Sequence, residues 1–179
     1  MKTWSKTILS VYKYLEALSN SIDNLVVKKS INSAFYNNGR YNTCYDCANK
    51  IMQLTERKIN LINIKILVDD TLKLMTINQR QLLALCYMDN VKSEQIAEMM
   101  NVSIRTFFRK KNEALNSFAK NLLMQGFTKE RLEEMFCGES WLNTLYIKNR
   151  DFDDSKEYRI DQYNKRRFFK SVLHEFNIV

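Results

Sequence analysis

The chain contains no proline and only three glycines among its 179 residues. Turns between the strands of a sheet are usually built with Gly, Pro or Asn-Gly pairs, and Asn38-Gly39 is the only Asn-Gly pair in this sequence. Helices need none of these residues in their interior, and proline would break them. The sequence therefore predicts an all-α fold in which Gly39, Gly126 and Gly138 lie between helices.

Residues 1–75 are predicted to form a long helical hairpin. Within 3–29, apolar residues alternate in steps of three and four, a helical period that continues for about three heptads. The residues of this stripe are Ile8, Val11, Leu15, Leu18, Ile22 and Leu25. The stripe is typical of an amphipathic core helix, and it is also long enough for a coiled coil with another copy of the chain.

A second long helix is expected after the polar loop 36–42. Thr43, followed three residues later by Asp46, is suited to cap this helix, which we expect to run from Cys44 to about Leu74. Its predicted apolar side consists of Ile51, Leu54, Ile59, Ile62, Ile66 and Leu72. Two long helices joined by one loop indicate an antiparallel pair.

The remaining residues have the pattern of shorter helices, which divides the chain into the hairpin, a segment 76–127 and a C-terminal helical extension 128–179. A residue suited to cap a helix precedes each one. These residues are Thr76, with Gln79, before 78–88; Ser93 before 94–100; Ser103 before a helix that ends at Gly126; and Thr128 before 129–136.

Lys and Arg outnumber Asp and Glu by 28 to 20, which gives a net charge of +8 at pH 7. The excess lies ahead of residue 128: residues 1–75 carry 11 basic and 6 acidic side chains and residues 76–127 carry 7 and 4, whereas 128–179 carry 10 of each. This bias favours a polyanionic partner, nucleic acid before an anionic membrane surface. We find no secretion signal and no apolar span of about 20 residues, so we expect a cytoplasmic protein that does not bind a membrane.

No residue pattern indicates catalysis, a metal ion or a cofactor, and we expect no enzyme. Cys44-x-x-Cys47 lacks further ligands at short spacing for a zinc site, because Cys86 and Cys137 are distant and His174 is the only histidine. In a reducing compartment these cysteines are expected to be free thiols. No Gly-rich phosphate loop, nucleophile elbow or paired-carboxylate motif is present.

The tail carries an acidic cluster, 151–154, and a basic, aromatic cluster, 165–170. The acidic cluster lacks the turn glycine and the final Glu of a calcium loop, so it favours a solvated loop. Two interpretations fit the basic cluster: its cations contact phosphates, or its two phenylalanines pack onto the body of the protein.

The stretch 82–118 predicts two short helices joined by a tight turn. Ile96 and Met100 place an apolar face on the first helix, and the small side chain of Ala97 lets a second helix approach closely. Asn101 falls where the turn requires φ > 0, a conformation that Asn tolerates better than most residues. The apolar face of the second helix consists of Phe107, Ala114 and Phe118.

The outward residues of such a second helix fit the major groove of DNA. There an Arg can bind guanine, and a Thr methyl or a Phe ring can contact thymine methyls. Residues at the two helix starts, with their N–H groups, are suited to phosphates. The candidate DNA-binding residues are Lys92, Ser93, Ser103, Ile104, Arg105, Thr106, Phe108, Arg109 and Lys110.

Three motifs in this stretch resemble region 4, the promoter-binding C-terminal domain of bacterial sigma factors. They are Tyr87-x-Asp89-Asn90-x-x-Ser93-Glu94-Gln95-Ile96-Ala97, Met100-Asn101-Val102-Ser103-x-x-Thr106-Phe107 and Ala114-Leu115. The helix-turn-helix of two-component response regulators is similar too. The resemblance covers about residues 74–118. It implies that the helix Ser103 to Leu115 binds the minus-35 element and that the domain contacts RNA polymerase.

Two departures limit this resemblance. Residues 1–75 lack the acidic and aromatic helix with which a complete sigma factor melts the minus-10 element. Lys111 stands where the family usually has an apolar residue, so either its stem lies along the protein while its amino group extends to water, or the helix is slightly rotated. The whole chain is therefore more similar to sigma-like regulators of phage type than to a complete sigma factor.

These observations predict a sequence-specific transcription regulator that binds double-stranded DNA. The hairpin would position it, either by forming a homodimer through residues 3–74 or by docking on RNA polymerase. The alternative is a protein-interaction adaptor or anti-activator that binds polymerase or another regulator without contacting DNA. DNA affinity that falls steeply with salt would distinguish the first hypothesis from the second.

Overall fold

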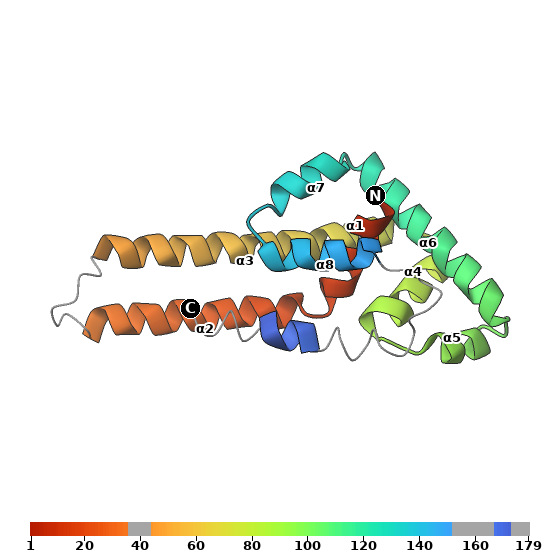
Figure 1. Ribbon diagram of the computed structural model, residues 1–179, viewed down its shortest axis with the longest axis horizontal. Helices are drawn as coiled ribbons and strands as arrows, with labels where there is room; N and C mark the ends of the chain where they lie inside the picture. The colour runs from red at the N-terminus through yellow and green to blue at the C-terminus, as the bar shows by residue number, and fades with distance from the viewer. Residues whose placement is uncertain (36–43, 152–166, 173–179) are drawn as a thin grey trace.

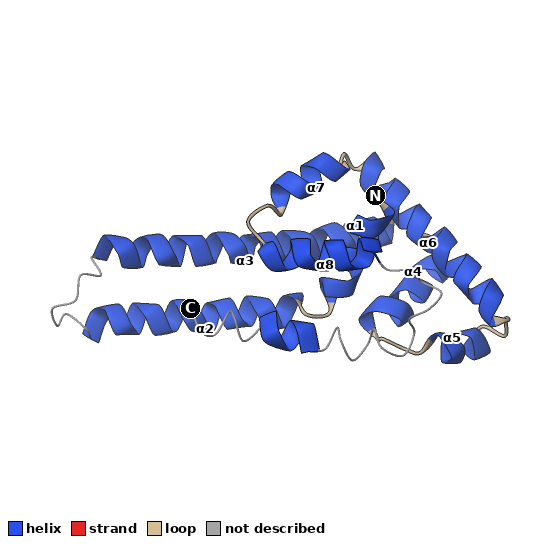
Figure 2. Cartoon of the chain, viewed as in Figure 1, coloured by secondary structure: helices blue, strands red, loops and turns tan. Residues whose placement is uncertain are grey.

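The computed structural model describes residues 1–35, 44–151 and 167–172, and no strand occurs within these ranges (Figures 1 and 2). The all-α prediction is confirmed. The helices are α1 (Lys2–Tyr12), α2 (Leu15–Phe35), α3 (Cys44–Lys73), α4 (Ile77–Leu83), the π-helical turn η1 (Ala84–Met88), α5 (Ser93–Met99), α6 (Ile104–Met124), α7 (Lys129–Met135) and α8 (Ser140–Asp151). Residues 167–172 add a short helical segment. No helix in the described part of the chain is long and apolar enough to span a membrane.

The predicted hairpin consists of α2 and α3, which lie side by side and antiparallel (Figure 1). All six apolar residues of the stripe within 3–29 are buried, as predicted. An ion pair also joins the two helices, because Lys58 Nζ on α3 lies 2.7 Å from Asp23 Oδ1 on α2. The loop residues 36–42 and the predicted cap Thr43 lie outside the described residues.

The first helix is interrupted, which the sequence did not predict. α1 ends at Tyr12 and α2 begins at Leu15, so the stripe is divided between two helices. α2 pairs with α3, whereas α1 packs mainly against α8 and α6. At the break, the ring of Tyr14 stacks on Phe169 with centroids 3.8 Å apart. Because of this break, the part of the apolar stripe on α1 packs mainly against α8 and α6, whereas the part on α2 packs against α3.

The predicted apolar side of α3 was wrong in part. Leu54 and Leu72 are buried as expected, but Ile59, Ile62 and Ile66 are exposed. The core is instead filled by other residues of this helix, namely Leu61, Ile64, Leu67 and Val68. α3 carries apolar residues on two faces, and the helical period alone does not indicate which face is covered.

The C-terminal extension packs back onto the beginning of the chain. Trp4 of α1 is fully buried, and its ring stacks on Tyr146 of α8 with centroids 4.6 Å apart. The side-chain amide of Asn149 donates to Thr7 Oγ1 at 3.0 Å. Phe169 is buried beside Tyr14, so at least this phenylalanine of the basic cluster packs onto the body. The buried side chains from α1 to this segment form one continuous cluster.

Two of the four predicted caps in the described part of the chain, Ser103 and Thr128, make the expected hydrogen bond. Ser103 Oγ and Thr128 Oγ1 accept hydrogen bonds from the backbone N–H groups of Thr106 and Arg131, each at 3.3 Å. Gly126 follows α6 with φ of 81°, a conformation that favours glycine at the end of a helix. These contacts confirm the predicted boundaries of α6 and the start of α7.

Two capping predictions need correction. Thr76 has the extended backbone of an N-cap, but its hydroxyl makes no capping hydrogen bond. The N-cap of α5 is Lys92, and Ser93 is already the first helical residue, with a side chain that is buried. The helix thus begins one residue earlier than predicted, because the extended conformation falls on Lys92.

Candidate nucleic-acid interface

The helices α5 and α6 are joined by a tight turn. The N–H of Val102 donates to the carbonyl oxygen of Ala97 at 3.0 Å, and the N–H of Asn101 donates to that of Glu98 at 2.9 Å. Asn101 has φ of 51°, as its place in the turn predicted. The backbone therefore reverses between α5 and α6 without a glycine.

The apolar side of α6 holds the helix against the rest of the molecule. Its buried residues are Phe107, Ala114, Leu115, Phe118, Ala119 and Leu122. α6 contacts α4, α1 and α3 besides α5, whose Ile96 and Ala97 are also buried. Because this face is covered along the whole length of α6, its opposite face is fixed in position and exposed to solvent (Figure 1).

Lys111 extends over aromatic rings, as expected for a lysine at an otherwise apolar position. Its Nζ lies 5.4 Å from the ring centroid of the buried Tyr87 and 6.0 Å from that of Phe108. Such contacts between an ammonium group and a ring face are attractive. The amino group thus stabilises the junction between η1 and α6.

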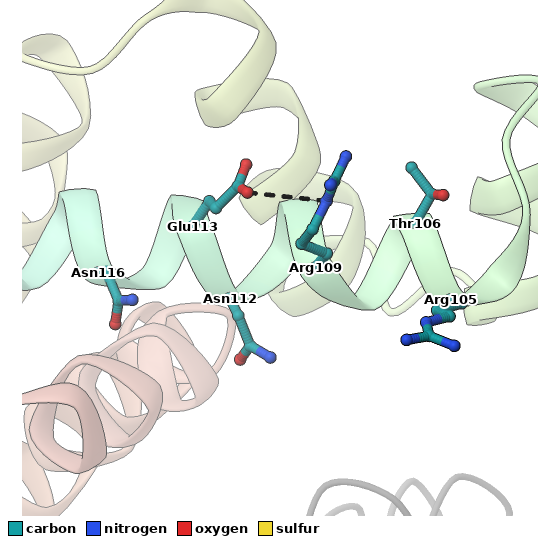
Figure 3. Close-up of a pocket in the computed structure, with 6 residues that line it drawn as sticks. All are labelled: Arg105, Thr106, Arg109, Asn112, Glu113 and Asn116. Carbon is teal, nitrogen blue, oxygen red and sulfur yellow. Dashed lines mark ion pairs between the residues drawn. The ribbon is translucent and has the colours of Figure 1, made fainter.

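Six polar residues of α6 line a shallow groove of about 490 Å³ on the exposed side of this helix: Arg105, Thr106, Arg109, Asn112, Glu113 and Asn116 (Figure 3). Steps of four, three and four residues separate Arg105, Arg109, Asn112 and Asn116, so these four lie on one face of a helix with 3.6 residues per turn. The groove is open and carries guanidinium and amide groups over more than two turns of α6.

Arg109 is partly held by a neighbour on its own helix. Its Nε lies 3.8 Å from Glu113 Oε1, and both side chains are mostly exposed (Figure 3). An exposed pair of this kind contributes only about 0.3–0.5 kcal/mol. Arg109 can therefore exchange Glu113 for another anion or acceptor at little cost.

The structure separates the candidate DNA-binding residues by exposure. Lys92, Ser103, Ile104, Arg105 and Arg109 are exposed. Thr106, Phe108 and Lys110 are half-buried, and Ser93 is buried. The hydroxyls of Ser103 and Thr106 lie 3.0 Å apart and are engaged in the cap of α6.

Two of these candidates are badly placed for direct contact. Ser93 is only 5% exposed, so its side chain offers little surface to a phosphate. Phe108 packs against the core and meets Phe107 edge to face, with centroids 5.2 Å apart, so its ring does not project freely. Asn112 and Asn116, which were not among the candidates, line the same groove, and their spacing of three and seven residues from Arg109 already places them on its face of the helix.

The cysteines are not arranged for chemistry near this surface. Burial raises the pKa of the Cys86 thiol to about 11, and the charge of Lys111 offsets only part of this rise. Cys47, Cys86 and Cys137 are free thiols. In the described part of the chain, no three His, Cys, Asp or Glu side chains lie close enough to hold a metal ion. The clusters at 152–154 and 165–166, and His174, lie outside the described residues.

The family model described as sigma-70, region 4 matches residues 65–115. These residues form a sigma region 4-like segment that includes the helix-turn-helix of α5 and α6. Region 4 here begins in the last turns of α3, includes α4, η1 and α5, and ends in the middle of α6. It covers less than a third of the chain. No curated protein and no solved structure gave a significant match.

The match to region 4 supports a DNA-binding role and a possible contact with RNA polymerase. Region 4 is a non-enzymatic domain, and within the matched residues α6 contains the segment Ser103 to Leu115 that was expected to bind DNA, apart from its N-cap Ser103. The matched segment also begins nine residues before the resemblance noted from sequence motifs, because it includes the end of α3.

Proposed function

We propose that the protein is a transcription regulator whose region 4 binds double-stranded DNA, with α6 in the major groove. The observation that carries this proposal is the polar face of α6, from Arg105 to Asn116, which lies opposite the face packed on the core. A rigidly held helix with exposed guanidinium and amide groups has the shape and the donors that base edges require.

The residues of this face have distinct roles in the proposal. Arg105 and Arg109 donate to the O6 and N7 acceptors of guanine, and the amide of Asn112 both donates to and accepts from adenine. Lys110 on α6 and Lys92 at the N-cap of α5 neutralise phosphates, which positions the helix without selecting a sequence. When Arg109 binds a base, the base takes the place of Glu113 as its partner.

The match to region 4 also supports a contact with RNA polymerase in the cytoplasm, where the regulator would meet both the enzyme and DNA. The net positive charge supports DNA over an acidic protein only weakly, because either partner would be attracted. The ordered polar face of α6 is the feature that favours DNA.

The test is selection of duplexes from a random pool by the full-length protein, followed by affinity measurements on the enriched sequence. We expect an enriched motif and an affinity that falls steeply with salt, because several phosphates release counterions. A pool that stays random after repeated rounds, together with no duplex binding at low salt, would refute the proposal.

A further inference from the structure

The solvent-facing side of α3 carries a regular apolar seam. Tyr45, Met52, Ile59 and Ile66 are spaced by seven residues, and their exposed fractions are 73, 60, 50 and 52%. Ile62, three residues after Ile59, is also exposed. We call these five residues the outer seam.

A second seam with the same spacing lies on the opposite face of α3. Leu54, Leu61 and Val68 are also seven residues apart, and all three are buried. They follow Met52, Ile59 and Ile66 by two residues, which corresponds to a rotation of about 200° around the helix axis. α2 and the rest of the core cover this inner seam, whereas nothing in the described part of the chain covers the outer one.

Isolated exposed apolar residues are normal, but the outer seam is continuous and periodic. From Tyr45 to Ile66 it extends for about 30 Å along α3, given a rise of about 1.5 Å per residue. The residues half a heptad away are Ala48, Thr55 and Ile62, two of which are small enough to let another helix approach closely. This is the a/d pattern with which helices pack as coiled coils.

We propose that the outer seam is the docking surface for a second copy of the chain, with the two α3 helices parallel. The β-branched Ile59 and Ile66 occupy a positions, where such residues pack in the seams of parallel coiled coils. The same register brings Lys65 at a g position opposite Asp70 at the following e position of the second copy, and both side chains are exposed. In such a pair each copy contributes the same apolar seam, and Lys65 of one copy meets Asp70 of the other. Both features fit a second copy of this chain as the partner.

The parallel arrangement has a geometric consequence. Region 4 begins in the last turns of α3 and continues beyond its C-terminal end in each copy, so both helix-turn-helices would lie at the same end of the pair. The dimer itself does not depend on DNA binding. Its test is therefore made without DNA, so that failure of the dimer and failure of the proposed function can be told apart.

The experiment is sedimentation equilibrium of the full-length protein over a wide concentration range. We expect a dimer for the wild type, and for the double variant Ile59→Ser/Ile66→Ser a dissociation constant raised at least about a hundredfold, because two apolar side chains are lost from each of two chains. The matched control is Val27→Ser/Ile31→Ser on α2, whose side chains have similar exposed fractions of 55 and 51%. This control variant should change the dissociation constant of the dimer by no more than about twofold.

Circular dichroism shows whether each variant stays folded. A wild type that is monomeric at every concentration, or a folded Ile59→Ser/Ile66→Ser variant that dimerises normally, would overturn the proposal. If both double variants weaken the dimer equally, the interface is not specific to the outer seam, and the proposal is also overturned.

Charge reversal tests the parallel register. Lys65→Glu and Asp70→Lys should each weaken the dimer by about threefold, since each sets like charges against one another, and the double variant should regain most of the loss. Asp70 also pairs with Lys73 of its own helix, at 2.8 Å. The quantity to measure is therefore the difference between the effect of the double variant on dimer affinity and the sum of the two single effects. Strictly additive losses would overturn the parallel register.

Discussion

Both carboxylate oxygens of Glu139 accept a hydrogen bond from the guanidinium of Arg57, each at 3.1 Å. Glu139 is almost completely buried, and it also accepts a hydrogen bond from the indole N–H of Trp141 at 2.5 Å. Arg57 lies on α3 and Glu139 immediately precedes α8. This one bidentate pair therefore fastens the C-terminal extension to the hairpin.

Removal of the cation should be costly, because it leaves a buried carboxylate with only the indole as partner. We expect Arg57→Ala to lower the free energy of unfolding by about 3 kcal/mol, at the low end for a broken buried pair since Arg57 is partly exposed. The measurement is urea unfolding at neutral pH. The neighbouring Lys58→Ala is the control, because its pair with Asp23 is exposed and should contribute less than about 1 kcal/mol. Equal losses for the two variants would contradict this assignment.

The cations of α6 should contribute to specific DNA affinity and not to folding. Arg105→Ala and Arg109→Ala are each expected to cost about 1–3 kcal/mol of binding to the selected duplex, with an unchanged melting temperature. Lys129→Ala is a matched control, since Lys129 forms an exposed pair with Glu133 at the same helical spacing as Arg109 with Glu113. Fluorescence anisotropy at fixed salt provides the affinities. If all three variants bind like the wild type, α6 is not the DNA-contacting helix.

The amide of Asn112 should select a base. We expect Asn112→Ala to lose about 1–3 kcal/mol of discrimination at one adenine position of the selected motif while leaving its other positions intact. Asn121→Ala is the control on the same helix: it lies nine residues further, which places it on the opposite side of α6. Repeating the selection with each variant gives the result directly. A motif unchanged by Asn112→Ala would remove this residue from the interface.

Tyr12 gives the fold a sensitivity to high pH. Burial, together with its hydrogen bond to Asp69 at 2.7 Å and the negative charge of that carboxylate, raises the pKa of Tyr12 to about 12. Because the folded-state pKa lies above the ordinary value of about 10, the stability that Tyr12 contributes is complete below pH 10 and is lost as the pH rises towards 12.

We therefore expect the wild type to lose more stability than Tyr12→Phe between pH 10 and 12. The difference should be about 1 kcal/mol, since the partial exposure of Tyr12 weakens the effect. Thermal unfolding of both proteins at several pH values in this range is the measurement. Parallel pH profiles would show that the Tyr12–Asp69 contact does not persist in solution.

Features that depend on neighbouring residues in the sequence were predictable. The cap Ser103, the turn residue Asn101 and the helix end at Gly126 each follow from the local chemistry of one side chain, and each was found as expected. The region 4 motif was recognisable for the same reason. Its spacing is set by the packing of two short helices, and that packing leaves a pattern in a single stretch of sequence.

Features that depend on distant partners were not predictable. Nothing in the residue types at positions 13 and 14 requires a break, yet the helix is interrupted there and α1 packs against α8, more than a hundred residues away. Both faces of α3 are apolar, so only the position of α2 decides which is buried. Phe108 looked like an outward residue of α6, but it packs beside Phe107 and Lys111.

The contact between α1 and α8 also sets an order of events during synthesis. The hydrogen bond from Asn149 to Thr7 joins residues 142 positions apart. Trp4 and its neighbours on α1 are made before region 4, yet their stacking partner Tyr146 is made only after the whole of region 4. A nascent chain thus carries a complete helix-turn-helix before it can close its own core, and any chain shortened ahead of residue 140 would keep that segment while leaving α1 without α8.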